Sequence, residues 1–400
     1  MSKQIIFNGK VVTREKVISK GYVTVSGGRI ESVAEGSPDD APDSMKIDAQ
    51  GGWIAPGLVD IHLHGNGGFW GFFAADEIIK MANSLSLLGV TSFAPATVSL
   101  PHSQVIKSIG EMKKAMSKQA AGSDVSVIPG ESFDTGARII ALNIEGPYIN
   151  PVRPGAHLPP AIRNPIDKEI DEILAAVGEN TPMLMTVAPE IEGGLALIDR
   201  LVAARALPSI GHSDATAEQT HEAIAHGANH FTHLFNAVRP FHQREPGCAF
   251  AALSDPGCSV EIILDNIHVH PDAAKVALAM KAPDKLVLVS DSIHAAGLPD
   301  GDYSVWGLKV TMKNNAVTLA DGTFAGSALT LNNAVKNAIG LLGASPELAF
   351  RCASSNGLSK LGMAGEIGVL ESGKIADIAI FDNDFNCMAT MIAGQIVYKK

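Results

Sequence analysis

Both ends of the chain alternate apolar and polar residues in short runs, a pattern typical of β-strands. The run QIIFNGKVVT is followed by GYVTVSGGRIESVAE and MKIDAQGGWIAPG, and Gly27-Gly28 is a signal for a hairpin turn. The end of the chain has the same character, with GEIGVLESGKIADIAIFD and MATMIAGQIVYKK. We therefore expect residues 1–55 and 363–400 to pair into one small β-sandwich domain built from both chain ends.

Between these ends, apolar runs of strand length alternate with amphipathic helical stretches. Eight such runs occur, at residues 58–64, 91–98, 138–145, 183–188, 208–212, 230–235, 259–265 and 286–291. A helical pattern follows each run except the sixth, because residues 240–257 show no clear amphipathic repeat. Strands alternating with helices indicate a parallel sheet. Eight such units predict an α/β fold, a (β/α)8 TIM-type barrel over residues 56–362, with a doubly wound open sheet as the alternative.

Composition and net charge disfavour nucleic-acid-binding and membrane proteins. Of 400 residues, 46% are apolar and 18% charged, which is enough material for a large buried core. The net charge of −11 disfavours a nucleic-acid partner, which would need a basic surface. The four cysteines form no C-x-x-C pair, and no signal-peptide pattern or apolar run long enough for a membrane span is present. We expect a soluble cytoplasmic protein with reduced thiols and no membrane partner.

Polar residues that could carry chemistry stand at the ends of five predicted strands. In a (β/α)8 barrel the carboxyl ends of all strands open on one mouth, where catalytic residues gather. These ends supply four histidines and two carboxylates: His62 and His64 on the first strand, Glu145 on the third, His212 on the fifth, His233 on the sixth and Asp291 on the eighth. We expect all six side chains to converge on this mouth.

These residue types favour a metal site. Imidazole nitrogens and carboxylate oxygens are ligands that Zn²⁺ and similar divalent ions select, and three such ligands plus a water form a catalytic site. The two-residue period of a strand sends His62 and His64 to the same face, so they could share one ion. Taken singly, each histidine also fits a hydrogen-bonded structural position, and each carboxylate could cap the next helix. It is the combination of the six that predicts metal binding.

Several separated motifs, in order along the chain, give a resemblance to a known family. GLVDIHLHG and a late ADIAIFD resemble the amidohydrolase superfamily. NIEGPYIN, GAH, GHSDAT, THLFNAVRP, REPG, ILDNIHVH, SDSIHAAG and AGSALTL together are similar to the N-acetylglucosamine-6-phosphate deacetylases of that superfamily. The similarity runs from about residue 50 to residue 385. It implies hydrolysis of an N-acetyl group to acetate and an amino-sugar phosphate, on a barrel with a flanking β-sandwich.

The resemblance also implies roles for individual residues. Glu145, His212 and His233 match the primary metal site of the family, and Asp291 matches its catalytic aspartate. A divalent cation lowers the pKa of water toward neutrality. Asp291 would take the proton of the attacking water and return it to the departing amine.

The resemblance ties the number of metal ions to His62 and His64. Some deacetylases of the family have Gln and Asn at these positions and work with one ion. Because this chain has both histidines, one or two divalent ions per subunit are expected, the second bridged by Glu145. Zn²⁺ is the first expectation, and Fe²⁺, Ni²⁺ and Co²⁺ accept overlapping ligand sets.

The substrate-binding residues are likewise implied by the resemblance. His268 would polarise the acetyl carbonyl or hold the sugar, and His157 would contact the sugar. The backbone amides of Asn236 and Ala237 match the phosphate cradle of the family. Arg244 offers a planar donor fork suited to a phosphate dianion. In this family the arginine can come from a neighbouring subunit, which implies a homodimer.

Three alternatives to this function remain. N-acetylgalactosamine-6-phosphate differs from the glucosamine substrate in the orientation of one hydroxyl, which motifs resolve poorly. A dihydroorotase-like hydrolase of cyclic amides often uses a carboxylated lysine on the fourth strand, and PMLMTVAPE contains no lysine. An inactive barrel that serves in assembly would have no need to keep Glu145, His212, His233 and Asp291 together.

Overall fold

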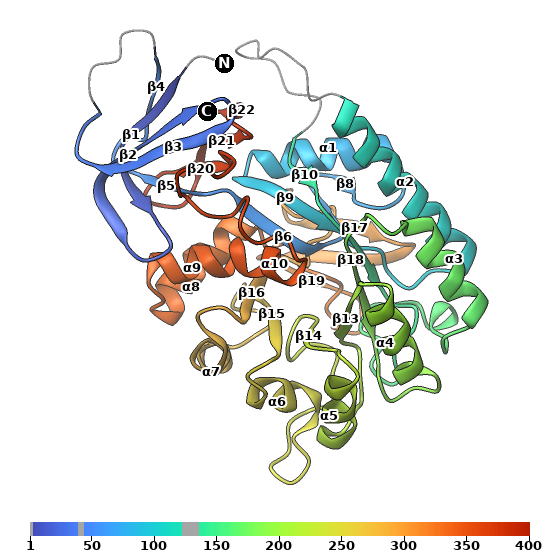
Figure 1. Cartoon of the computed structure of the whole chain (residues 1–400). Coiled ribbons are helices and arrows are strands. Elements are labelled where there is room, and N and C mark those ends of the chain that lie inside the picture. Colours follow the sequence, from blue (N-terminus) through green and yellow to red (C-terminus); the bar gives the residue numbers. More distant parts are fainter. Residues whose placement is uncertain (1–2, 39–43, 122–135) are drawn as a thin grey trace.

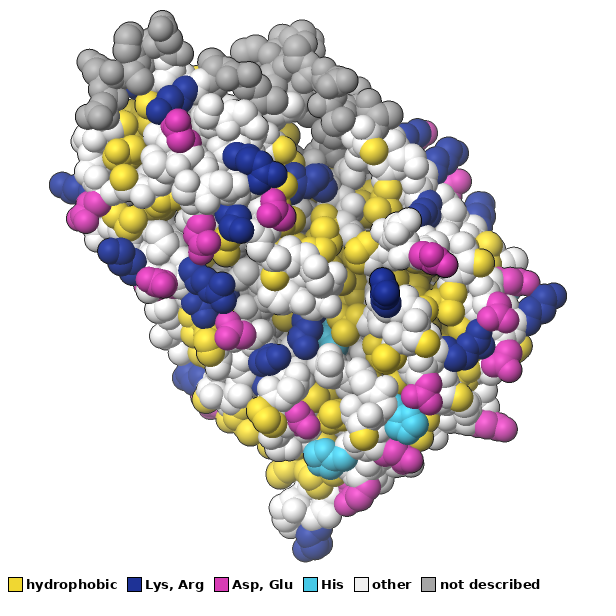
Figure 2. All heavy atoms as spheres, in the orientation of Figure 1, with side chains coloured by type: hydrophobic (Ala, Val, Ile, Leu, Met, Phe, Trp, Pro, Cys, Tyr) yellow, Lys and Arg dark blue, Asp and Glu magenta, His cyan; other side chains and the backbone are white. Residues whose placement is uncertain are grey.

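The computed structural model describes residues 3–38, 44–121 and 136–400, and contains a barrel and a sheet-rich domain built from both chain ends (Figure 1). None of the predicted site residues lies outside these ranges. In the described parts, no helix combines the length and the apolar character that crossing a membrane requires. On the face in Figure 2, basic and acidic side chains of the described residues are interspersed.

Eight strand positions form the barrel. In order they are β6 (Leu58–Leu63), β9 (Val90–Pro95), β10 (Arg138–Ile139) continued by β11 (Leu142–Glu145), β12 (Met183–Val187), β13 (Leu207–Ile210), β14 (His230–Phe231), β15 (Ser259–Ile263) and β16 (Leu286–Val289). Neighbouring strands pair in parallel, with a bridge between Ala96 and Asn143 linking β9 to β11. The Asp291 amide donates to the His62 carbonyl at 2.9 Å and closes the ring. Every residue of β6, β9, β12 and β15 is buried, since helices cover the outer face of the barrel.

Eight helices follow the eight strand positions: α1 (Ala75–Ser86), α2 (His102–Ala121), α3 (Asp167–Val177), α4 (Gly194–Ala203), α5 (Ala217–Ala225), α6 (Gly247–Ser254), α7 (Pro271–Lys281) and α8 (Leu331–Leu342). The (β/α)8 fold is thus confirmed. The expectation that residues 240–257 lack a helix is wrong. Helix α6, GCAFAALS, has apolar residues on nearly all sides and most of them are buried, so it shows no amphipathic contrast in the sequence.

Smaller elements decorate the barrel. Helices α9 (Pro346–Cys352) and α10 (Ser355–Lys360) follow α8, and a 3-10 turn spans Pro159–Ala161. The hairpin β7 (Gly65–Asn66) and β8 (Phe69–Trp70) follows β6. A three-stranded antiparallel sheet, β17 (Gly301–Val305), β18 (Leu308–Lys313) and β19 (Ala316–Thr318), is inserted between β16 and α8. This insertion falls within the range assigned to the barrel from the sequence.

The chain ends meet in one mixed sheet. Its strands are β1 (Gln4–Val12), β2 (Val17–Ser26), β3 (Arg29–Glu35), β4 (Met45–Asp48), β5 (Trp53–Pro56), β20 (Ile378–Phe381), β21 (Cys387–Ile392) and β22 (Gln395–Lys399). They run in the order β22-β21-β20-β5-β1-β2-β3, and β4 pairs with β1 beside β5. Ile6, Val23, Ile380 and Met391 pack into one core from both halves of the sheet. The boundaries at residues 55 and 363 stay a prediction.

A partly buried ion pair joins the barrel to this sheet. Arg138 of β10 donates to both carboxylate oxygens of Asp377, one residue before β20, with Nη1 to Oδ1 at 3.1 Å. The Asp377 side chain is 1% exposed, whereas Arg138 is 30% exposed. Burial raises the pKa of Asp377, and Arg138 works against this. The folded protein therefore holds a proton on Asp377 more readily than the unfolded chain does.

Arg138→Met is expected to lower the free energy of unfolding at neutral pH by roughly 3 kcal/mol, because it leaves a buried carboxylate without its cation. The pKa of Asp377 then rises further, so the loss grows as pH rises through that pKa and shrinks at acid pH, where Asp377 is protonated. Melting temperatures at pH 5 and pH 7.5 measure it. Arg200→Met is the control, because its partners Asp167 and Asp171 are exposed. Equal shifts for the two variants would contradict the prediction.

Candidate active site

A pocket of about 270 Å³ opens at the carboxyl ends of the barrel strands. Its lining contains predicted site residues together with residues of the insertion after β16: His64, Glu145, Gly155, Ala156, His157, His212, His233, Asn236, Ala237, His268, Asp291, Trp306, Thr323, Phe324 and Gly326. A larger hollow, of about 870 Å³, lies between the ends of α3 and α4 and contains none of the predicted site residues. The chemistry is therefore gathered in the smaller pocket.

Glu145, His212 and His233 form one compact group at the ends of β11, β13 and β14. The Nε2 atoms of His212 and His233 lie 3.2 Å and 3.0 Å from Glu145 Oε1, and 3.0 Å from each other. All three side chains are buried. Their ligand atoms lie close enough together to hold one metal ion.

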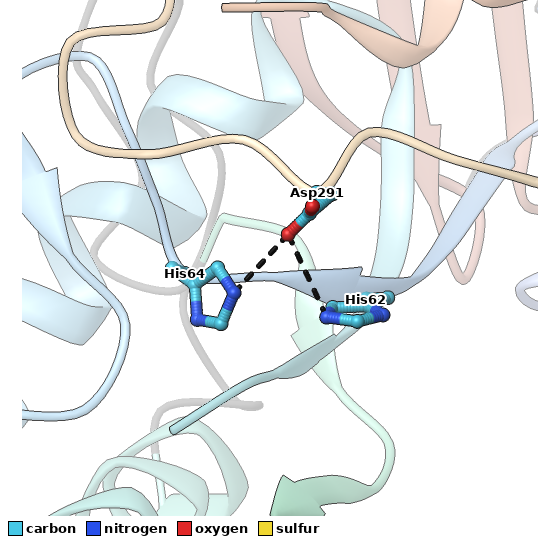
Figure 3. A group of neighbouring side chains, drawn as sticks. All are labelled: His62, His64 and Asp291. Carbon is cyan, nitrogen blue, oxygen red and sulfur yellow. Dashed lines mark ion pairs between the residues drawn. The ribbon is translucent and has the colours of Figure 1, made fainter. Parts of the chain in front are cut away.

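His62, His64 and Asp291 form a second group of the same kind (Figure 3). Asp291 Oδ1 lies 3.1 Å from His64 Nε2 and 3.6 Å from His62 Nε2. The two histidines leave β6 on the same face, in agreement with the period of a strand. Each ring is also held through its other nitrogen, Nδ1. His64 Nδ1 lies 3.1 Å from the carbonyl of Ala96, and His62 Nδ1 lies 2.8 Å from Glu261 Oε2.

Glu145 lies between the two groups and contacts both. Its Oε1 atom faces His212 and His233 and is 3.5 Å from His62 Nε2. Its Oε2 atom lies 3.2 Å from His64 Nε2. The two ligand groups therefore share this carboxylate.

The donor set fits divalent cations. The Nε2 atoms of His212 and His233 face each other at 3.0 Å, so at most one proton fits between them. Both atoms also face the same oxygen of Glu145. His62 Nε2 is buried and has no hydrogen-bond partner among the described residues. Nitrogens and carboxylate oxygens aimed at common points are the ligands that Zn²⁺ and similar ions take.

Burial and nearby charges favour the ligand forms of Glu145 and His212. Burial opposes the ionisation of Glu145, but the neighbouring histidines, His62 first, outweigh it and hold its pKa well below the usual range. Burial, aided by the nearby charge of His157, lowers the pKa of His212 to about 4. At neutral pH, Glu145 is therefore an anion and His212 a neutral imidazole.

Asp291 is ionised as well. Burial opposes its charge, but the hydrogen bond with His64, followed by the charge of His62, keeps the pKa of Asp291 below its ordinary value. Burial likewise opposes the charge of His64, whose hydrogen bonds with Asp291 and Glu145 raise its pKa to about 9. Asp291 at neutral pH is thus a carboxylate able to accept a proton.

Three of these residues have left-handed backbone conformations. His212, His233 and Asp291 each lie two residues past a strand and have positive φ angles of 47°, 28° and 49°. Such angles are uncommon for residues with a side chain and persist where the surrounding structure enforces them. In each case the chain turns out of the strand directly at the residue whose side chain faces the pocket.

Four of the predicted substrate residues line the same pocket. His157 Nε2 lies 3.3 Å from Glu145 Oε2, and His157 Nδ1 accepts the Ser99 amide at 2.9 Å. His268 Nδ1 lies 2.6 Å from Asp265, which holds the ring. Asn236 and Ala237 follow β14, but the Asn236 amide donates to the carbonyl of His233 at 3.0 Å rather than to the pocket.

The structure does not bring Arg244 together with these residues. It is exposed on the loop between β14 and α6 and is not among the residues that line the pocket. Its backbone amide lies 3.3 Å from His242 Nδ1 in the same loop.

Sequence reasoning missed the aromatic wall of the pocket. Trp306, in the turn between β17 and β18, donates from Nε1 to the carbonyl of Ala156 at 3.1 Å, and its ring centroid is 5.7 Å from that of His64. Phe324 lies against His268 with centroids 4.8 Å apart. The alternation in DYSVWGLKVTM with Gly307 at the turn is a hairpin signal that could have revealed the insertion.

It also missed Glu261, a carboxylate inside the barrel. Glu261 is the third residue of β15, SVEII, and is 1% exposed. A single charged residue within an apolar strand run is the signal, since buried carboxylates are rare unless paired.

Comparison with known proteins gives the class. The amidohydrolase family matches residues 53–397, and the chain belongs to this family. An N-acetylglucosamine-6-phosphate deacetylase of Bacillus subtilis is 33% identical over 390 residues, covering 97% of this chain and 95% of the relative. The resemblance to N-acetylglucosamine-6-phosphate deacetylases that the motifs indicate is thereby confirmed.

Two further relatives are deacetylases whose names give their substrates. An N-acetylgalactosamine-6-phosphate deacetylase of Escherichia coli O157:H7 is 33% identical over 344 residues, covering 86% of this chain and 87% of the relative. An Asp-to-Ala mutant of the N-acetyl-D-glucosamine-6-phosphate deacetylase of Mycobacterium smegmatis, in complex with N-acetyl-D-glucosamine-6-phosphate, has a TM-score of 0.89 and 30% identity, with 100% of both chains covered. The likeness extends over the barrel and the sheet domain.

Proposed function

We propose that this chain is a metal-dependent enzyme that hydrolyses the N-acetyl group of N-acetylglucosamine-6-phosphate to acetate and glucosamine-6-phosphate. The observation that carries the proposal is the pair of buried ligand groups that share Glu145 at the mouth of the barrel. The likeness to deacetylases over nearly the whole chain supports the substrate class.

Glu145, His212 and His233 would hold one divalent ion, and His62 and His64, with Asp291 beside them, would hold a second. Zn²⁺ is proposed, with Fe²⁺, Ni²⁺ or Co²⁺ as alternatives that accept the same donors. Such an ion lowers the pKa of water and polarises a carbonyl. The buried carboxylates of Glu145 and Asp291 supply the negative charge that two cations close together require.

Asp291 is proposed as the general base and acid. As an ionised carboxylate facing the pocket, it can accept the proton of the attacking water and return it to the amine, which leaves poorly without a proton. His268, fixed by Asp265, is placed to polarise the acetyl carbonyl or hold the sugar, and His157 to contact the sugar.

The phosphate is proposed to lie beside Asn236 and Ala237, with Arg244 supplied by a neighbouring subunit of a homodimer. The exposure of Arg244 and its position outside the pocket of its own chain support a role in the partner's site. A guanidinium is the donor best matched to a phosphate dianion. We also propose that the protein is cytoplasmic, since its four cysteines are free thiols.

Acetate release from a panel of sugars tests the function. The metal-loaded protein is incubated with N-acetylglucosamine and N-acetylgalactosamine, each with and without the 6-phosphate, and with dihydroorotate as a cyclic amide. We expect the highest kcat/KM for N-acetylglucosamine-6-phosphate. No acetate from any sugar would overturn the proposal, and a higher kcat/KM for the galactosamine substrate would assign the chain to that activity instead.

Arg244→Ala is expected to raise KM for the phosphorylated sugar roughly 10- to 100-fold, because a hydrogen bond to a charged group is lost. If Arg244 acts in the partner's site, mixing this variant with Asp291→Asn restores one complete site in each mixed dimer. About half of the dimers are then mixed, and each mixed dimer has one complete site out of two. At low substrate concentration the mixture should therefore give about a quarter of the wild-type rate. Arg205→Ala, an exposed arginine after α4, is the control. No recovery on mixing would place Arg244 in its own site.

A further inference from the structure

Glu261 makes contacts with both ligand groups from inside the barrel. Its Oε2 atom lies 2.8 Å from His62 Nδ1 and accepts the backbone amide of His233 at 3.2 Å. Its Oε1 atom lies 3.1 Å from Nε2 of His230, whose Nδ1 is 2.6 Å from the hydroxyl of Ser259. The carboxylate is thus held by three partners at the level beneath the pocket.

The contact with His62 sets which ring nitrogen faces the pocket. With Nδ1 directed at Glu261, Nε2 points toward Glu145 Oε1 at 3.5 Å and Asp291 Oδ1 at 3.6 Å. A carboxylate at Nδ1 requires a proton on that nitrogen, so the neutral ring presents its lone pair at Nε2. A histidine that binds a metal through one nitrogen commonly donates from the other to a carboxylate.

We propose that Glu261 is a positioning residue for the second ion: it orients His62 so that the group of His62, His64 and Asp291 can hold a divalent cation. The inference rests on the proposed function, because it takes this mouth to be a site for two cations. Glu261 itself is not among the residues that line the pocket. Its negative charge beneath His62 adds to the anionic surroundings that a second cation needs.

Packing of the strand alone does not require a carboxylate at this position. A buried charge costs free energy unless its partners compensate, and an apolar residue of similar volume is often as stable. The other residues of β15 after Ser259 are Val260, Ile262 and Ile263, so an apolar side chain would suit the strand. The alternative explanation is that Glu261 serves to satisfy His230, and the experiment separates the two.

Three variants divide the contacts of Glu261. Glu261→Gln keeps an oxygen acceptor of the same shape and removes the charge, whereas Glu261→Met removes both at similar length. His230→Gln replaces the imidazole partner on the other oxygen with a neutral amide and leaves the contact with His62 in place. Zinc per chain, measured by mass spectrometry after equilibration at a series of free Zn²⁺ concentrations, gives the stoichiometry and the affinity of each ion. Melting temperatures of the metal-free proteins report stability separately.

The wild type and His230→Gln are expected to bind two ions per chain. Glu261→Met should lose the weaker ion, with its affinity reduced roughly 10- to 100-fold, and Glu261→Gln should fall between them. A wild type that saturates at one ion, a Met variant with the wild-type affinity, or an equal loss in His230→Gln would each overturn the proposal. If the Met variant does not fold, an unchanged affinity in the Gln variant would also overturn it. Because metal counting needs no substrate, failure of deacetylation leaves this test intact.

Discussion

Asp291→Asn is expected to keep its metal and to lose deacetylation. The kcat for the phosphorylated sugar should fall roughly 100- to 10,000-fold, the usual contribution of a positioned general acid and base. Asn has nearly the same shape as Asp but cannot take the proton of the attacking water. Glu145, His212 and His233 form their own group, so at least one ion should remain bound. Acetate release and metal content measure the two effects.

Asp377→Asn is the matched control for this variant. It also changes a buried aspartate to asparagine, but at the contact between the barrel and the sheet, away from the pocket. It should lower the melting temperature and leave kcat unchanged. A rate near that of the wild type in Asp291→Asn would show that another group moves the proton. A fall in kcat of the same size in Asp377→Asn would show that the loss is a consequence of instability.

The barrel could be predicted from the sequence because its strands are buried on both faces. A parallel strand such as β16, LVLV, therefore appears as a continuous apolar run, and most helices between the strands show a clear amphipathic repeat. The same runs place His212, His233 and Asp291 at the strand ends. Their convergence follows from the topology of a barrel, in which all carboxyl ends share one mouth.

Helix α6, Trp306 and Glu261 were not predicted. The helix lacks a contrast between apolar and polar faces, and the two residues act through contacts with residues distant in the sequence. Helix α6 is apolar on nearly all sides, so no face is marked. Trp306 reaches the pocket only because the insertion folds back over the loop of Ala156, 150 residues earlier. Glu261 acquires its role from His62, 199 residues away. Spacing along the chain contains no signal for either contact.

The role proposed for Arg244 depends on a second subunit. Its motif marks it as a phosphate ligand by resemblance, yet the fold of one chain leaves it on an exposed loop. In the proposed function this side chain completes the site of a neighbouring subunit, so the assembly rather than the fold would place it there. The mixing experiment with Asp291→Asn tests this directly, because it restores activity only across a subunit boundary.

Removal of the divalent ions with a chelator is expected to reduce acetate release at least about 1000-fold, because the pKa of water is then about 15.7 instead of about 7. It should also lower the melting temperature, since ligands at about 100 times their Kd stabilise a fold by about 2.7 kcal/mol each. Adding Zn²⁺ back should restore both. Glu145→Gln, which loses the charge between the two ligand groups, should show the low rate before chelation and little further change after it. A chelated wild type that is free of metal by mass spectrometry and keeps its rate would refute metal dependence.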